Sequence, residues 1–318
     1  MYKIKQFPED FIVDEQFTLQ THSSGYYSYW LMKKRDLSTL SAVHAIAQDL
    51  KIPIKFIKYS GNKDKVAITS QLISIYKMPI EKIKTLNIKN ISLEYLENFE
   101  EPIHLGMHQG NDFKIIVRNL DKEITPKQNI PNLFGSQRFS LNNVEIGRSI
   151  VKNDFEKAAK LVEESDFDVI RRHLLRHPMD YVGALRNLPL NLLRLYIHSY
   201  QSNIWNETVN RFLKYSPEAK QQSIPIIGFS TELGTSFVAG LIKEIMIEEN
   251  ITFRSFIIRQ IPELSVEGGE RMLYMDVSNL KISPLEEDEL NQDKSKCTVQ
   301  FTLGKGSYAT VLIDFLCR

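Results

Sequence analysis

The order of hydrophobic patterns along the chain limits the fold more than any single motif does. Strand-like runs dominate the first 155 residues, long helical segments follow, and residues 298–315 return to a β-rich sequence. A strand-rich tail after a helical middle indicates that the middle is an insertion and that the tail completes the sheet of the first domain. We therefore predict an α+β fold in which residues 1–155 and 281–318 form one domain, and residues 156–280 form an inserted, more helical domain.

The first domain is predicted to alternate strands with short helices. Residues 10–19 alternate apolar and polar side chains with the period of a strand that has one buried face. The aromatic run 26–32 follows Ser23-Ser24-Gly25, so we expect it to form a hairpin with the first strand. Residues 37–50 have helical spacing, with Asp36 or Ser38 as the N-cap. The remaining expected elements are strands at 56–59, 66–76, 91–96 and 113–118, and helices at 80–86, 143–165 and 189–215.

Composition favours an ordinary soluble protein. Of the 318 residues, 42% are hydrophobic and 25% are charged, which suffices for a real core. No apolar run approaches the roughly 18 residues of a membrane span, and the N-terminal segment lacks the apolar core of a signal peptide. The two cysteines, Cys297 and Cys317, fit neither zinc ligation nor a disulfide framework. We expect a cytoplasmic protein with reduced thiols, without membrane contact, and a monomer.

The net charge of +1 does not by itself indicate a nucleic-acid-binding protein. Any surface for a polyanion must therefore be a local patch. One run of basic residues suits that role as well as it suits an ordinary solvated face. Its members are Lys33, Lys34, Arg35, Lys51, Lys55, Lys58, Lys63 and Lys65.

Asp64 lies between the last two members of this basic run, Lys63 and Lys65, in a turn between two predicted strands. Gly, Asn and Asp are common turn formers, so a structural role for Asp64 is one interpretation. The other is an acid whose charge is tuned by Lys63, Lys65 or another nearby cation, and which stays ionised as a nucleophile. Because the turn lies at the end of a strand pair, its side chains can be rigidly held and still reach solvent.

Other candidate groups are aromatic or polar. Phe11, Phe134 and Tyr308 each lie in a segment that could reach a common cleft and offer a stacking face to a base, although each could equally belong to a core. Asn132 follows Pro131, a position where asparagine is most often a turn former. Its amide could also recognise the edge of a uracil with one donor and one acceptor. The pairs His104/His108 and His173/His177 lack the further ligands of a zinc site, so we predict no metal.

Five segments together are similar to the motifs of a known family, the TruD tRNA pseudouridine synthases. Residues 61–71 resemble its GxKDxxAxTxQ signature, and residues 132–139 resemble its NYFGxQRF motif with Leu133 in place of the usual aromatic residue. The other three are Lys5 with residues 8–13 (PEDFIV), residues 305–310 (KGSYAT) and residues 195–202 (LYIHSYQS). Their shared order along the chain makes a chance match unlikely, whereas any one of them alone would be weak.

The resemblance implies a pseudouridine-synthase catalytic fold, a mixed sheet flanked by helices, with a family-specific domain inserted into it. By motif, Asp64 would be the catalytic aspartate and Lys5 its basic partner. Contacts to the target nucleotide would come from Phe11, Asn132 and Tyr308, while Phe134 would pack beside the base. Residues of the same motifs that would bind RNA or support the site are Lys63, Lys65, Gln71 and Arg138.

The implied reaction converts a uridine of tRNA, by family analogy uridine 13 of the D-arm, into pseudouridine. One carboxylate suffices, adding to the base or attacking C1′ of the ribose, and both routes stay open. The uridine must be flipped out of the RNA stack. Neither a metal nor an organic cofactor is required. Two other hypotheses remain. The first is a tRNA-binding or tRNA-folding protein that clamps a flipped uridine without chemistry. The second is a hydrolase with an aspartate nucleophile, which is disfavoured because no motif places a second carboxylate as its acid/base partner.

Overall fold

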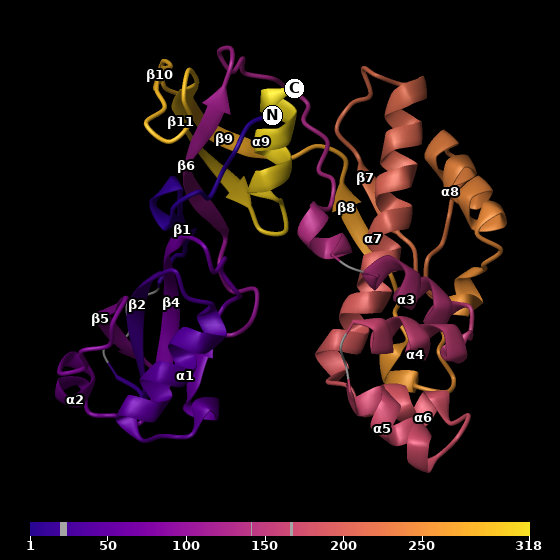
Figure 1. The fold of residues 1–318 in the computed structure, drawn as a ribbon, viewed down its shortest axis with the longest axis horizontal. Helices are drawn as coiled ribbons and strands as arrows, with labels where there is room; N and C mark the ends of the chain where they lie inside the picture. The colour runs from indigo at the N-terminus through magenta and orange to yellow at the C-terminus, as the bar shows by residue number, and fades with distance from the viewer. Residues whose placement is uncertain (20–23, 141, 166–167) are drawn as a thin grey trace. The chain divides into compact units, whose positions relative to one another are not determined.

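The chain divides into two compact units. The computed structural model describes residues 1–19, 24–140, 142–165 and 168–318. The first unit comprises Met1–Gln128 and Asp276–Arg318, so it contains both termini (Figure 1). The second unit, Asn129–Met275, is a continuous insertion between them. Within the described residues, no helix combines the length and the hydropathy needed to cross a bilayer.

A mixed sheet forms the body of the first unit. Its path runs β10-β11-β6-β1-β4-β2-β5, with β3 beside β4 and β9 beside β11. The pair β1–β4 is parallel and the other pairs are antiparallel. The predicted α+β class is confirmed. The strands are β1 (Phe11–Gln16), β2 (Tyr27–Arg35), β3 (Ile57–Tyr59), β4 (Ile68–Tyr76), β5 (Ile91–Phe99), β6 (Gly110–Leu120), β9 (Val277–Ile282), β10 (Glu286–Glu287) and β11 (Ser295–Gly304).

The predicted hairpin between the first two strands is wrong. β1 lies between β4 and β6, with Val13 opposite Thr69 on one side and Phe11 opposite Ile115 on the other, while β2 pairs with β4 and β5. Part of the expected turn, residues 20–23, lies outside the described residues. Pairing on both edges buries Phe11 and Val13, and a tight hairpin with β2 would give up this central position.

Helices cover the sheet of the first unit. In α1 (Thr39–Leu50) the N-cap is Ser38, whose hydroxyl accepts a bond from the Ser41 amide, and its buried face packs with residues of β2 and β4. α2 (Ile80–Lys84) is a short helix before β5. Our prediction that residues 298–315 are β-rich is wrong beyond Gly304, where β11 ends and α9 (Ala309–Cys317) follows. Ala309, Leu312, Ile313 and Leu316 have helical spacing and are buried, so tertiary packing overrides the β preference of this sequence.

The second unit is mainly helical and is built around one long helix, α7 (Leu190–Tyr215). α3 (Asn143–Val151) lies so close to α7 that a Cβ atom on Gly147 would be 2.0 Å from the Tyr196 carbonyl oxygen. The unit includes α3 because it begins at Asn129, whereas we predicted a start after residue 155, and it ends at Met275, whereas we predicted 280. The other elements are α3 (Asn143–Val151), α4 (Phe155–Glu164), α5 (Asp168–Arg176), α6 (Tyr181–Arg186), α8 (Phe237–Glu248), β7 (Ser223–Ile226) and β8 (Gly269–Met272).

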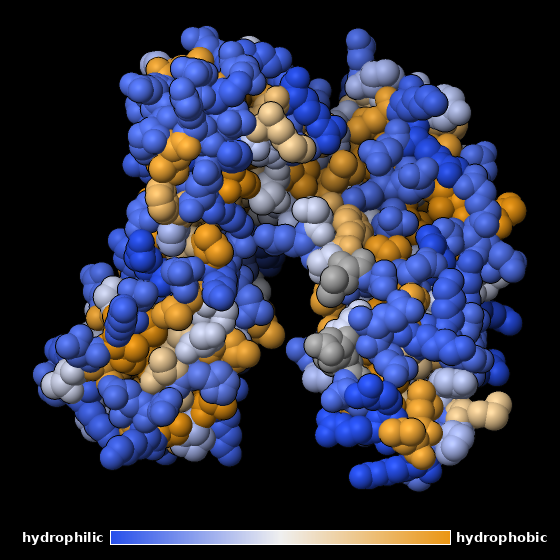
Figure 2. Space-filling view, viewed as in Figure 1, coloured by the Kyte–Doolittle hydropathy of each residue, from blue (hydrophilic) through white to orange (hydrophobic). Residues whose placement is uncertain are grey.

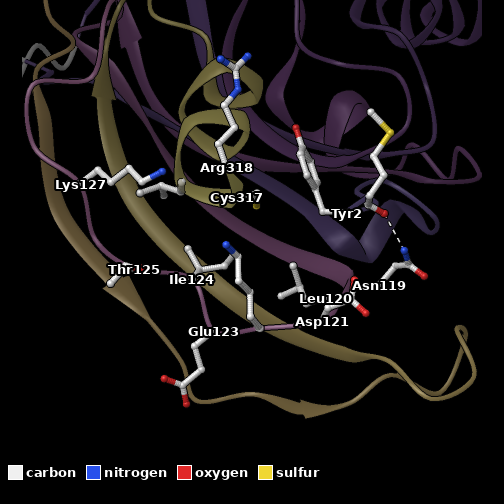
Figure 3. Close-up of a pocket in the computed structure, with 13 residues that line it drawn as sticks. Tyr2, Asn119, Leu120, Asp121, Glu123, Ile124, Thr125, Lys127, Cys317 and Arg318 are labelled. Atoms are coloured by element: carbon white, nitrogen blue, oxygen red, sulfur yellow. Dashed lines mark hydrogen bonds between the residues drawn. The ribbon is translucent and has the colours of Figure 1, made fainter.

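Hydrophilic residues dominate the visible surface of each unit, with apolar residues in small patches (Figure 2). A separate cavity of about 480 Å³ in the first unit lies beside the end of α9 and is lined by residues from both termini and from the segment after β6 (Figure 3). There the Asn119 side chain donates to the Met1 carbonyl oxygen. None of the predicted site residues lines this cavity.

Candidate active site

Asp64 lies in the loop between β3 and β4, and buried side chains brace that loop. The Gln71 side chain donates to the Gly61 carbonyl oxygen at 2.9 Å and accepts from the Thr39 hydroxyl at 2.8 Å. The same hydroxyl accepts from the Lys63 amide at 2.9 Å. Gln71 and Thr39 are almost completely buried, so these bonds are shielded from water. Gln71 therefore supports the loop and does not lie on the surface.

The carboxylate of Asp64 forms an ion pair with Lys5. Nζ of Lys5 is 3.0 Å from Oδ1 of Asp64, and the two side chains are 18% and 32% exposed. The same ammonium lies 4.0 Å from the centroid of the Phe11 ring, which is itself 1% exposed. Lys5 thus contacts a buried aromatic face and a carboxylate that remains accessible. Its backbone has φ 58, in the left-handed region that non-glycine residues adopt only when neighbouring contacts impose it.

Those neighbouring contacts come from Arg118 of β6. Lys3 and Arg118 exchange two backbone hydrogen bonds. The Arg118 guanidinium binds Asp10 at 2.9 Å and Asp288 at 3.0 Å. Through its backbone at Lys3 and its guanidinium at Asp10, Arg118 holds both ends of the segment that carries Lys5. Burial of Asp288 opposes its charge, but bonds from the Asn119 amide, from other donors and from Arg118 outweigh it and lower the pKa of Asp288 to about 2.

Two more lysines of the basic run contact the Asp64 loop from inside the protein. Nζ of Lys34 donates to the Asp64 carbonyl oxygen at 2.7 Å. Lys63 points away from solvent and binds the buried carboxylate of Glu15, with Nζ 2.6 Å from Oε1. Glu15 also accepts from the Ser60 hydroxyl and the Leu72 amide. Lys65, in contrast, is exposed.

The loop after β11 contributes Tyr308, which is half-buried and occupies the N-cap position of α9. Lys305, three residues earlier, reaches the segment before β6, where its Nζ lies 3.4 Å from the Gly106 carbonyl oxygen. Gly106 in turn donates its amide to the carbonyl oxygen of Ser60, at the start of the Asp64 loop. The C-terminal motif and the Asp64 motif are therefore linked within the first unit.

The second unit contains a separate cluster around Asn132 and Phe134. The guanidinium of Arg271, in β8, donates to Oδ1 of Asn132 at 2.7 Å and lies 4.1 Å from the centroid of the Phe134 ring. The Phe134 backbone is held at both its amide and its carbonyl group by the Asn206 side chain. Arg138 is half-buried, with its guanidinium carbon 5.7 Å from the Phe134 centroid. Asn132 is thus an oriented side chain and not simply a turn former.

Comparison with known proteins identifies the family. The family model described as tRNA pseudouridine synthase D (TruD) matches residues 2–169, 164–222 and 217–314. A relative from Nanoarchaeum equitans, assigned as a tRNA pseudouridine synthase D, is 31% identical over 99% of this chain and 98% of its own. The tRNA pseudouridine synthase D of Aquifex aeolicus is 28% identical over 98% of this chain and 97% of its own.

The chain belongs to the TruD family of tRNA pseudouridine synthases. The family predicted from the motifs is therefore confirmed, and with it the class of enzyme. A solved structure from Methanosarcina mazei, assigned as a TruD protein, superimposes with a TM-score of 0.78 and 27% identity, and covers 99% of this chain and 93% of that chain. This match confirms the predicted fold class, because the TruD structure has the same α+β architecture.

The TruD motifs fall on both units. The structure brings Asp64, Lys5 and Phe11 into contact in the first unit, which also contains Tyr308. It places Asn132, Phe134 and Arg138 together in the second unit. The roles of these residues toward a nucleotide remain predictions at this point.

Sequence reasoning missed Glu15, Thr39 and Arg271 as parts of the site and considered Lys34 only as a surface cation. A signal was present for two of them. Glu15 continues the buried series Phe11 and Val13 in β1, and Lys34 lies on a buried position of β2. A charged residue at an inward-facing strand position indicates a buried partner. Nothing in the sequence around Arg271 distinguishes it from a surface arginine.

Proposed function

We propose that this protein isomerises a uridine of tRNA to pseudouridine, with Asp64 as the nucleophile and, following the family resemblance, uridine 13 of the D-arm as its target. The observation that carries the proposal is the Asp64–Lys5 pair: an accessible carboxylate, 3.0 Å from an ammonium, on a loop braced by buried hydrogen bonds. A nucleophile needs both access and a fixed position. The names of the relatives supply the reaction class and the tRNA.

The chemistry requires one carboxylate and no net redox change. The N1–C1′ bond of the uridine breaks, the uracil turns, and C5 bonds to C1′; the proton that leaves C5 balances the one that N1 gains. Asp64 either attacks C1′, as the nucleophile of a retaining glycosidase does, or adds to the base. In both routes the Lys5 ammonium orients the carboxylate and offsets its charge.

The uridine reaches Asp64 only after leaving the stack, at a cost of a few kcal/mol that aromatic contacts can offset. For Tyr308 and Phe134 we propose contact with the flipped nucleotide. The Phe11 ring is buried beneath the Lys5 ammonium, so we propose that it supports Lys5 and meets the nucleotide only through a rearrangement of Lys5. The Arg271 guanidinium donates to Oδ1 of Asn132, and we propose that this bond orients the Asn132 side chain for contact with the nucleotide.

The alternative, a clamp for tRNA without chemistry, gives the Asp64 carboxylate no role. The decisive measurement is pseudouridine mapping in tRNA from cells with and without this protein, followed by complementation with Asp64→Asn. We expect the modification to disappear without the protein and to stay absent with Asp64→Asn, although the purified variant still binds tRNA. Asp14→Asn, which changes an exposed acid of β1, is the matched control and should restore the modification. Modification restored by Asp64→Asn would contradict the proposal.

A further inference from the structure

Lys34 is the most deeply buried cation beside the Asp64 loop. Its side chain is among the largest fully buried ones of the described residues, with 1% exposure. Nζ donates to two backbone carbonyl oxygens, that of Leu37 at 2.6 Å and that of Asp64 at 2.7 Å. The strand around it is fixed on both sides, because Lys34 pairs with Thr69 of β4 and with Ile91 of β5.

This environment is costly for a structural lysine. Burying an ammonium is unfavourable unless opposite charge or good acceptors compensate. Both acceptors of the Lys34 ammonium are neutral carbonyl groups. Burial lowers the pKa of Lys34 to about 8, the charge of Asp64 raises it, and the charge of Lys63 lowers it. The opposite charge that favours the Lys34 ammonium is therefore the carboxylate of Asp64.

We propose that Lys34 is a positioning residue for Asp64: it fixes the main chain of the nucleophile and supplies buried positive charge next to the Asp64 loop. This inference rests on the proposed function of Asp64. Lys5 and Lys34 then have different tasks. Lys5 pairs with the carboxylate at the accessible surface. Lys34 holds the peptide group of the same residue from the interior.

The geometry excludes the simpler role of Lys34 as a phosphate ligand. A lysine that is 1% exposed and donates to two carbonyl groups has no path to RNA without unfolding of the loop. Its neighbour Lys33 is exposed on the other face of β2. The two lysines are adjacent in sequence and opposite in environment, so Lys33 provides a matched control.

The test compares Lys34→Met with Lys33→Met in single-turnover pseudouridine formation and in tRNA binding. A misplaced nucleophile costs on the order of 100-fold in rate. We expect Lys34→Met to lose about that much in rate while its Kd for tRNA changes less than about threefold. Lys33→Met should keep the wild-type rate whatever its Kd. A folded Lys34→Met protein with a rate near that of the wild type would overturn the inference.

Two further measurements cover other outcomes. The wild-type rate should fall as the pH rises through about 8, because Lys34 then loses its charge, and Lys34→Met should lack this fall. The charged groups that act on Lys34 are Asp64 and Lys63. Because the Lys63 charge lowers the pKa of Lys34, Lys63→Met should retain the fall in rate and shift it to higher pH. If Lys34→Met does not fold, Lys34→Gln, which keeps a donor without the charge, takes its place. Wild-type activity in Lys34→Gln would then overturn the role of the charge.

Failure of this inference is distinguishable from failure of the proposed function, since only the latter predicts an active Asp64→Asn enzyme.

Discussion

Replacing Glu15 by glutamine is expected to destabilise the protein and to loosen the Asp64 loop. Oε1 of Glu15 is 2.6 Å from Nζ of Lys63, and the exposed fractions of the two side chains are 0% and 7%. Glutamine keeps the size of the side chain but leaves the Lys63 ammonium buried without a counter-ion. Removing one partner of a buried ion pair costs about 3–5 kcal/mol. Since single domains are stable by about 5–15 kcal/mol, the variant should still fold at low temperature.

The assay is a double-mutant cycle in urea unfolding that combines Glu15→Gln with Lys63→Met. Each single change leaves one buried charge without its counter-ion, whereas the double variant removes both charges. We expect the double variant to be more stable than the sum of the single changes predicts, with a coupling free energy of about 1–3 kcal/mol. The control is the exposed pair Lys84–Glu81, with side chains 50% and 83% exposed, where Glu81→Gln should cost less than about 1 kcal/mol.

The same variants connect stability to catalysis. Lys63 directly precedes Asp64, so Glu15→Gln should also lower the single-turnover rate under conditions in which the variant is fully folded. Two results would refute this reasoning: additive effects of the single changes in the cycle, or a cost of Glu15→Gln no larger than that of Glu81→Gln. Either one would mean that the buried pair is not energetically coupled.

Three further outcomes can be measured. The folded-state pKa of Asp288, about 2, lies below its ordinary value of 3.8, so its contribution to stability is present above that value and is lost as the pH falls toward 2. The stability advantage of the wild type over Asp288→Asn, followed by circular dichroism, should shrink over that window. Arg271→Leu should lower the rate of pseudouridine formation by releasing Asn132, whereas Arg259→Leu, at an exposed position, should not. Lys65→Ala should reduce the salt dependence of tRNA binding by about one ion if it contacts a phosphate, and an unchanged slope would count against that contact.

Most elements of the first unit could be predicted because their patterns are local. The helix after Ser38 has an N-cap and helical spacing, and the structure places it at Thr39–Leu50. Pairing was less predictable: β1 inserts between β4 and β6, and its partners lie far along the chain. The final helix, α9, was predicted as a strand because its β-branched residues favour strands locally, while packing decides the outcome.

In the candidate site, too, local motifs could be recognised from the sequence, whereas contacts between distant residues could not. Residues within motifs, such as Asp64 and Lys5, could be selected from the sequence, and the structure pairs them. Glu15 and Lys34 could not be assigned a task, because an inward-facing charge indicates that a partner exists but not which one. The partner of Glu15 is 48 residues away, and that of Lys34 is a backbone carbonyl group 30 residues away. Only the pairing of the strands brings these groups together.

The basic run around Asp64 therefore consists of buried and exposed cations. Lys34 and Lys63 are buried and act on the loop from inside, whereas Arg35 is exposed and pairs with Glu9 at 2.6 Å. The two buried lysines contribute to the charge of the run without being available to RNA. A tRNA phosphate can meet only the exposed cations of the run, and Lys65 in the Asp64 loop is the one for which we predict such a contact. A lysine-rich sequence beside a candidate catalytic acid is thus evidence for internal electrostatics as much as for nucleic-acid binding, and the exposed fraction of each side chain decides between them.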